Sequence, residues 1–199
     1  LYSSAASDVY KRQNMLIKQA VSRAKKVFGC SHLKYSDALL DYGFFLLNVD
    51  SITKSVNVYK QALEIKQQNL GTKNIYVAIA HEDLSYALYV LEYSSGNFDA
   101  ALNNIEICID IMADLIKDNP LMQASAKRVK ALILEEIALD SMIAIAANNP
   151  NRKSQPMLKE SEELHLAALK LSLEAFGENN VQTAKHYGNL GRLYQSMCN

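Results

Sequence analysis

One eleven-residue pattern occurs three times in the sequence and constrains its fold more than any other feature. "QAVSRAKKVFG" ends at Gly29, "QALEIKQQNLG" at Gly71 and "AALKLSLEAFG" at Gly177, and the first two glycines are 42 residues apart. Each copy has an alanine nine positions before its glycine and a bulky apolar residue directly before it. A helix that packs closely at a small residue and ends at a left-handed glycine has this pattern. We therefore predict three repeated helices.

A second amphipathic segment follows each glycine after a short polar turn. These segments are "KYSDALLDYGFFLL", "IYVAIAHEDLSYALYV" and "VQTAKHYGNLGRLYQS". Each contains a large apolar residue followed by a small one, which allows two antiparallel helices to approach closely: Tyr42-Gly43, Leu84-Ser85 and Leu190-Gly191. We predict helical hairpins stacked side by side, because no hairpin of this kind can bury its apolar face alone.

The expected fold is all-α, since helix-favouring residues dominate and alternating strand patterns are almost absent. Pro120 and the stretch 148–156 should interrupt it, and they make the third repeat longer and irregular. Residues 14–199 then form one array of about three hairpins with half a repeat at each end, whereas 1–13, "LYSSAASDVYKRQ", resembles a translated library adaptor and is expected to be a tail outside the fold. The predicted helices are 14–28, 34–48, 51–70, 75–93, 98–116, 120–147, 154–176 and 181–197.

Composition excludes several classes of function. Basic and acidic residues both number 21, so neither nucleic acid nor an anionic membrane surface is an expected partner. The longest apolar run, "MIAIAA" at 142–147, is too short to span a membrane. Three widely spaced cysteines and four unpaired histidines indicate neither a disulfide framework nor a metal site. We expect no cofactor and no catalytic activity.

The repeat resembles the tetratricopeptide repeat (TPR) in its longer kinesin-light-chain form, which recurs every 42 residues. The matching positions are the large-small pairs above and the small residues of the second helices: Ser55 and Ala62, Ala101 and Cys108, Ser161 and Ala168. This resemblance implies a right-handed superhelical solenoid. Its concave groove, lined by the first helix of each hairpin, would bind extended peptides.

A narrower resemblance is carried by "KYSDALLDYGFFLLNVDSITKSV", "VAIAHEDLSYALYVLEYSSGNFDAAL", "SAKRVKALILEEIALD" and "NVQTAKHYGNLGRLYQSM". It is to cytoplasmic TPR proteins associated with substrate recognition in a cullin-2-RING ubiquitin ligase, with the amyloid precursor protein tail and with microtubules. It implies peptide segments as ligands, the cullin-2 and elongin machinery as partners, and a cytoplasmic location that extends to the cytoskeleton and nucleus. No elongin-binding box precedes Met15. The alternative is a kinesin-light-chain-like cargo adaptor.

In this family a polar residue just before each large-small pair faces the groove, which corresponds here to Asp41, Asp83 and Asn189. Helical spacing extends the same face to Asp37, Glu82, Tyr86, Lys185 and Arg192. We expect a groove that is acidic at its N-terminal end and basic at its C-terminal end, complementary to a peptide with a cation at one end and a carboxylate at the other. The alternative is that these charges form the solvated face of amphipathic helices.

Overall fold

The computed structural model describes residues 2–93, 95–116, 121–146 and 154–197. Within these residues the chain is helical and has no strand, which confirms the all-α class. The predicted boundaries agree to within two residues except at the start of the first helix. The helices are α1 (Tyr2–Phe28), α2 (Leu33–Asn48), α3 (Ile52–Leu70), α4 (Ile75–Glu92), α5 (Asp99–Leu115), α6 (Met122–Ala146), α7 (Ser154–Phe176) and α8 (Val181–Met197).

Three helices end at the repeated glycine, as predicted. Gly29, Gly71 and Gly177 have φ values of 91°, 75° and 76°, a region that side chains rarely adopt. The N–H of each donates to the carbonyl four residues earlier, at 2.9, 3.0 and 2.9 Å. The next helix then begins with a side-chain cap from His32, Asn74 or Asn180. These turns are tight enough to fold each helix back on its neighbour.

Within the hairpins, small residues bring two helices into close contact. A Cβ added to Gly43 of α2 would meet the Tyr59 ring of α3 at 2.8 Å, so only glycine fits there without a shift. The Ser55 hydroxyl donates to the Gly43 carbonyl at 2.7 Å across the same contact. In the second hairpin the Ser85 hydroxyl donates to the Ala101 carbonyl at 2.7 Å. Each buried hydroxyl is thereby satisfied at the point of closest approach.

The even-numbered helices form the inner surface of the array. Each helix contacts its neighbours in the chain. In addition, α2 contacts α4, α4 contacts α6, and α6 contacts α8. The odd-numbered helices make no such contacts with one another in the described part of the chain. The array therefore curves with the first helix of every hairpin on its inner side, and any groove formed by this curvature is lined by those helices.

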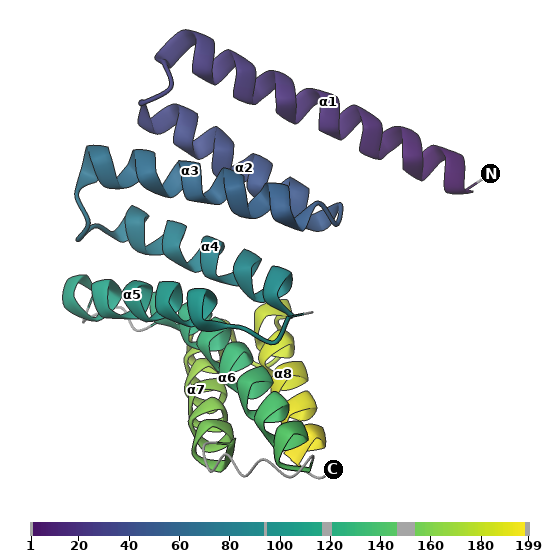
Figure 1. The fold of residues 1–199 in the computed structure, drawn as a ribbon, viewed down its shortest axis with the longest axis vertical. Coiled ribbons are helices and arrows are strands. Elements are labelled where there is room, and N and C mark those ends of the chain that lie inside the picture. Colours follow the sequence, from purple (N-terminus) through teal and green to yellow (C-terminus); the bar gives the residue numbers. More distant parts are fainter. Residues whose placement is uncertain (1, 94, 117–120, 147–153, 198–199) are drawn as a thin grey trace.

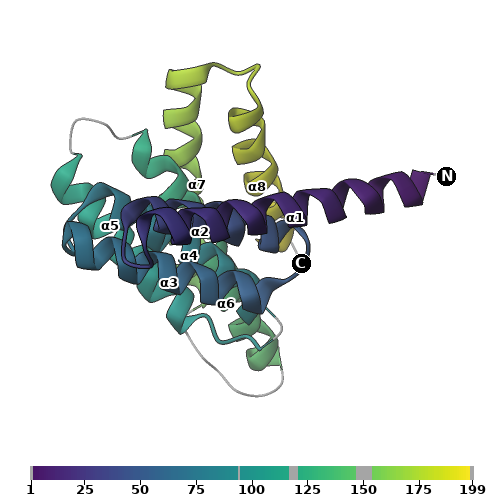
Figure 2. The ribbon, with the colours of Figure 1, turned by 90° about the horizontal axis from the view of Figure 1, so that it is seen from above.

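The array changes direction between its second and third hairpins. Helices α1 to α5 lie side by side, whereas α6, α7 and α8 run across them (Figure 1), and the view from above shows the same turn (Figure 2). The largest apolar cluster extends from Val56 of α3 to Ile133 of α6 and so crosses this corner. Of the predicted interruptions, Pro120 and 147–153 lie outside the described residues, and Pro156 falls in the first turn of α7, where proline is tolerated.

The first helix corrects one prediction. We expected it to begin near residue 14, but α1 extends back to Tyr2 and includes most of the stretch assigned to a tail. Residues 2–13 contain neither glycine nor proline, so nothing in them interrupts a helix that is already formed. Residues 8–13 are exposed, and their one ion pair, between Lys11 and Asp8, lies within the helix itself.

Candidate functional site

A groove of about 660 Å³ lies in the corner where the two parts of the array meet. Both parts contribute to it, since its walls come from α2, α3 and α4 on one side and from α6, α7 and α8 on the other. Its lining residues are Phe44, Leu47, Tyr59, Glu82, Asp83, Tyr86, Leu121, Ala124, Ser125, Arg128, Val129, Ser172, Phe176, Gln182, Lys185 and His186. The curvature of the inner helices thus provides one surface with apolar, acidic and basic parts.

The α4 wall of the groove is acidic. Glu82 and Asp83 are half-buried, and neither has an ion-pair partner within 4 Å among the described residues. The pKa of Asp83 is raised to about 7, chiefly by burial and then by the neighbouring Glu82 charge, against the opposing effect of Lys66. Burial also raises the pKa of Glu82, although a hydrogen bond with Ser125 and the charge of Arg128 oppose this. An incoming cation would stabilise both carboxylates.

The opposite wall is basic. Arg128 of α6 places its guanidinium over the Tyr86 ring, 5.7 Å from the ring centroid, which joins the two walls by a cation–π contact. Lys185 and His186 follow on α8. Burial lowers the pKa of His186, and the charges of Arg128 and Lys185 lower it further, so this imidazole is neutral at pH 7. The groove therefore has a negative wall and a positive wall on either side of an aromatic ring.

The structure brings together four of the eight residues predicted for the site: Glu82, Asp83, Tyr86 and Lys185. The other predicted acids on α2 lie elsewhere. Asp37 accepts a hydrogen bond from the Lys66 ammonium at 2.7 Å, outside the groove. Asp41 lines a different cavity, between α1 and α2. Its charge still acts on Tyr59, which lines the groove. The pKa of this phenol is raised first by burial and then by the charges of Asp83 and Asp41.

The predicted residues at the C-terminal end of α8 also lie outside the groove. Asn189 does not line it, and Arg192 binds Glu135 of α6 at 2.9 Å and approaches Glu136 at 3.9 Å. Glu135 is only 1% exposed, so the arginine neutralises a carboxylate that is almost completely removed from water. Arg192 is thus committed to the joint between α6 and α8. The predicted basic face contributes only Lys185 to the groove.

The sequence reasoning missed the contribution of α6, namely Ser125, Arg128 and Val129. The register of α6 is visible in a contact, since the Ser161 hydroxyl donates to the Ala131 carbonyl at 2.9 Å, as Ser55 does to Gly43. Ala131 is therefore the small residue of the third hairpin, and Val129, two positions before it, corresponds to Asp41 and Asp83. The position directly before Ala131, where the repeat predicts a large apolar residue, is occupied by Lys130, so this repeat is not recognisable from the sequence.

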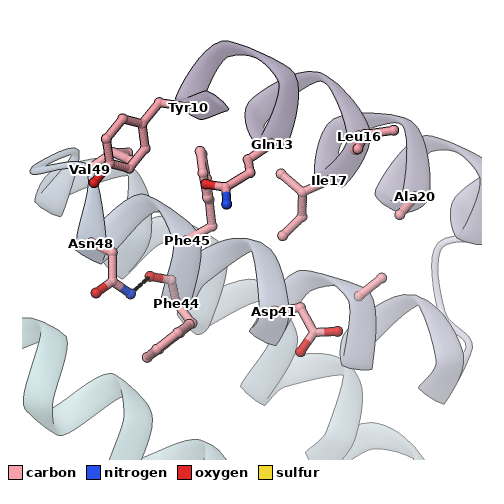
Figure 3. Close-up of a pocket in the computed structure, with 11 residues that line it drawn as sticks. Tyr10, Gln13, Leu16, Ile17, Ala20, Asp41, Phe44, Phe45, Asn48 and Val49 are labelled. Atoms are coloured by element: carbon pink, nitrogen blue, oxygen red, sulfur yellow. Dashed lines mark hydrogen bonds between the residues drawn. The ribbon is translucent and has the colours of Figure 1, made fainter. Parts of the chain in front are cut away.

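A second cavity, of about 760 Å³, lies between α1 and α2 (Figure 3). Its α1 wall includes Gln13, Ile17 and Ala20, which stand 42 positions before the α3 residues Ser55, Tyr59 and Ala62. Phe44 also lines this cavity and is 64% exposed, and its carbonyl accepts a hydrogen bond from Asn48 at 2.8 Å. Phe44 lines the corner groove as well, so this one aromatic residue borders both cavities.

Several titratable groups lie in the interior. His81 and His165 are only 6% and 0% exposed, so both imidazoles lie in the core. Cys108 is fully buried and its pKa is raised, chiefly by burial, which makes it an inert thiol. In the described part of the chain, no helix is long and apolar enough to cross a bilayer, and no three His, Cys, Asp or Glu side chains are grouped to hold a metal ion.

The fold is that of a TPR-like α-solenoid. The TPR-like repeats of a kinesin light chain protein from Podosopora anserina superpose with a TM-score of 0.60 at 16% identity, covering 96% of this chain and 81% of that one. A single-residue variant of the same repeats gives a TM-score of 0.62 at 14% identity, covering 96% and 80%. These similarities establish the architecture.

The sequence is similar to amyloid protein-binding protein 2. The proteins of that name from Rattus norvegicus and Mus musculus are each 55% identical over 188 residues, which is 94% of this chain and 31% of theirs. The chain thus spans about a third of the length of these curated relatives. No protein-family model matches the sequence.

Proposed function

We propose that the chain is a non-enzymatic, protein-binding scaffold whose corner groove holds an extended peptide with a basic side chain against the α4 wall. The observation that carries this proposal is the pair of half-buried carboxylates, Glu82 and Asp83, which face the groove without an ion-pair partner among the described residues. An arginine or lysine of a ligand would supply that partner. The aromatic rings of Tyr86 and Phe44 would pack against its aliphatic part.

The experiment compares a charge-neutralised groove with a matched control. Glu82→Gln and Asp83→Asn remove the two charges without changing side-chain size, and Asp110→Asn removes one from an exposed position on the outer helix α5. Binding of fluorescein-labelled arginine peptides is measured by anisotropy. We expect the groove variants to lose about tenfold or more in affinity, because hydrogen bonds to charged groups contribute roughly 1.5–3 kcal/mol. Unchanged affinity in both groove variants would contradict the proposal.

The pH dependence of the same binding gives a second readout. Because the pKa of Asp83 is raised to about 7, a large part of this carboxyl is protonated at neutral pH in the free groove. Affinity for an arginine peptide should therefore rise as the pH increases from about 6 to about 8, and Asp83→Asn should remove most of the rise. The measurement separates a specific carboxylate contact from attraction to the general surface charge.

At the cellular level, we propose that the scaffold recognises substrates for a cullin-2-RING ubiquitin ligase, including cytoplasmic tails such as that of the amyloid precursor protein. The support is the 55% identity to amyloid protein-binding protein 2, a protein named for binding amyloid protein. Co-purification of elongin B/C and cullin-2 with the full-length protein is the expected result. Their absence, together with co-purification of a motor heavy chain or microtubules, would instead favour the cargo-adaptor alternative.

A further inference from the structure

The basic wall of the groove has a positive charge that no anion neutralises. Arg128, Lys185 and His186 line it together, and within the described residues none of them has an ion pair shorter than 4 Å. Arg128 lies on the Tyr86 ring, which fixes its direction but supplies no negative charge. Glu82 on α4 feels the charge of Arg128 but is hydrogen-bonded to Ser125. The wall therefore offers three donor groups to one region of the groove.

Two buried histidines have ring nitrogens without a hydrogen-bond partner among the described residues. His186 is 6% exposed and lines the groove, and its Nδ1 atom is buried with no hydrogen-bond partner. On α7, His165 is fully buried, and neither of its ring nitrogens has a partner. Buried polar atoms are nearly always hydrogen-bonded in folded proteins. Because His186 belongs to the groove lining, a group bound in the groove is a candidate for the partner that its imidazole lacks.

The charged groups that act on His186 are both positive. Arg128 on α6 and Lys185, its neighbour on α8, lower its pKa in addition to the larger effect of burial. The pKa of His165 is lowered to about 4, first by burial and then by Arg192, His186 and Arg128. No carboxylate contributes to either shift. The site is consequently positive, which is a favourable environment for an anion.

We propose that Arg128, Lys185 and His186 form an anion subsite, which receives a carboxylate or phosphate group of the same peptide whose basic side chain binds Glu82 and Asp83. This inference rests on the proposed peptide-binding function. Arg128 and Lys185 provide the charge, and the His186 Nδ1 provides a hydrogen bond once it carries a proton. The preferred ligand thus has a cation and an anion separated by a short spacer that crosses Tyr86.

Proton uptake should accompany binding of the anion. A negative group next to His186 raises the pKa of its imidazole, opposing the effects of burial, Arg128 and Lys185. Close to pH 6.5 the bound complex then holds a proton that the free groove lacks. Calorimetry in two buffers of different ionisation enthalpy at this pH measures the net change in bound protons, which includes the proton that the ligand arginine displaces from Asp83. Comparing a peptide that ends in Glu with one that ends in Gln isolates the proton taken up by His186, because both peptides carry the same arginine. His186→Asn keeps a hydrogen-bonding side chain but cannot titrate, and it should abolish the difference between the two peptides.

The binding test uses labelled peptides that differ only in their last residue. Each has an N-terminal arginine, a spacer of two to five alternating serine and alanine residues, and an amidated Glu, phosphoserine or Gln. The wild-type protein should bind the Glu or phosphoserine peptide at least about tenfold more tightly than the Gln peptide for the best spacer. A greater preference for phosphoserine identifies a phosphate site, and equal preference identifies a general anion site.

Substitutions test whether the preference for anionic peptides arises from the basic wall. Arg128→Gln and Lys185→Gln should each reduce the preference for the anionic peptides to less than about threefold. Lys127→Gln is the matched control, since Lys127 precedes Arg128 on α6 but does not line the groove; it should keep the full preference. Circular dichroism of each variant establishes that it is folded.

Different results overturn different proposals. If all three peptides bind equally and lose affinity in Asp83→Asn, the anion subsite is wrong and the peptide groove stands. If the anion preference persists unchanged in both Arg128→Gln and Lys185→Gln, the subsite is again wrong. If no arginine peptide binds at any spacer length, the proposed function fails and the subsite fails with it.

Discussion

The two parts of the solenoid are joined by different kinds of contact. From α1 to α5 the helices pack through apolar side chains and close approaches such as Gly43 against Tyr59, and the most buried charge, Lys66, reaches out to an exposed aspartate. From α6 to α8 the joints contain Glu135 with Arg192 and the unpartnered His165. The 42-residue spacing belongs to the first part only.

This difference shows how a repeat array accommodates an irregular unit. A regular spacing lets the same small residue meet the same large one in successive hairpins, and steric fit alone then specifies the joint. In the stretched third unit, Lys130 replaces the large apolar residue and pairs instead with Glu160 at 3.0 Å and Glu106 at 3.4 Å, on the two outer helices beside it. In this unit, directional polar contacts specify how the helices pack, as steric fit does in the regular repeats.

The largest expected effect concerns the buried histidine of the second part. The pKa of His165 is about 4 in the folded chain against 6.5 in the unfolded chain. Below pH 6.5 the unfolded chain therefore binds a proton that the folded chain does not, and the free energy of unfolding decreases until the pH reaches about 4. The full loss is about 3 kcal/mol.

His165→Met should remove this loss while filling a similar volume. Urea unfolding of both proteins at pH 7.5 and pH 5.0, followed by circular dichroism, isolates the histidine, because the raised pKa values of buried acids such as Asp83 change the stability of both proteins in the same way. The same decrease in stability in both proteins would show that the acid sensitivity arises elsewhere.

The second effect tests the charged joint between α6 and α8. Arg192→Met leaves Glu135 buried without its cation, which costs 3–5 kcal/mol for a fully buried pair. Because Arg192 is 42% exposed, we expect about 2 kcal/mol. Lys159→Met, which breaks an exposed pair with Glu163 at 4.0 Å, should change stability by less than about 0.5 kcal/mol. Equal effects of the two substitutions would show that the buried pair between α6 and α8 contributes no more to stability than an exposed ion pair.

The third effect tests steric fit in the first part. A Cβ at Gly43 would lie 2.8 to 2.9 Å from three atoms of the Tyr59 ring, and a ring packed between helices cannot move aside easily. Gly43→Ala should therefore destabilise the protein by about 1–2 kcal/mol in spite of its higher helix propensity. Combining it with Tyr59→Leu should restore part of the loss. Gly43→Ala would have no effect if the ring were free to shift.

The smallest effect has the opposite sign and uses the corresponding position of the last helix. Gly191 of α8 matches Gly43 in the repeat, but nothing in the described structure lies within 4 Å of a Cβ built there. Gly191→Ala should stabilise the protein by about 0.5–1 kcal/mol through helix propensity alone. The same substitution at two equivalent positions thus distinguishes a packed joint from an open one. A loss of stability at Gly191 would contradict this.

The helices, their order and the inner face of α4 could be predicted because they depend on local patterns. Glycine ends, large-small pairs and spacing determine which side of α4 faces inward, so the sequence predicts Glu82, Asp83 and Tyr86 on one surface, and all three line the corner groove. The contribution of α6 to the groove could not be predicted, because Lys130 stands where the pattern requires an apolar residue. Arg192 was assigned to the open face because its partner, Glu135, is distant in sequence and is revealed only by packing.

The position of α4 has a consequence for how the molecule resists force. This helix has nine buried residues between Val77 and Tyr89 and contacts α3, α5, α2 and α6, whereas α1 and α8 each lie at one edge of the array. If the two ends of the chain are pulled apart, the edge helices should peel away first, since each loses contacts on one side only. The last resistance should come from α4, where separation breaks contacts on every side at once.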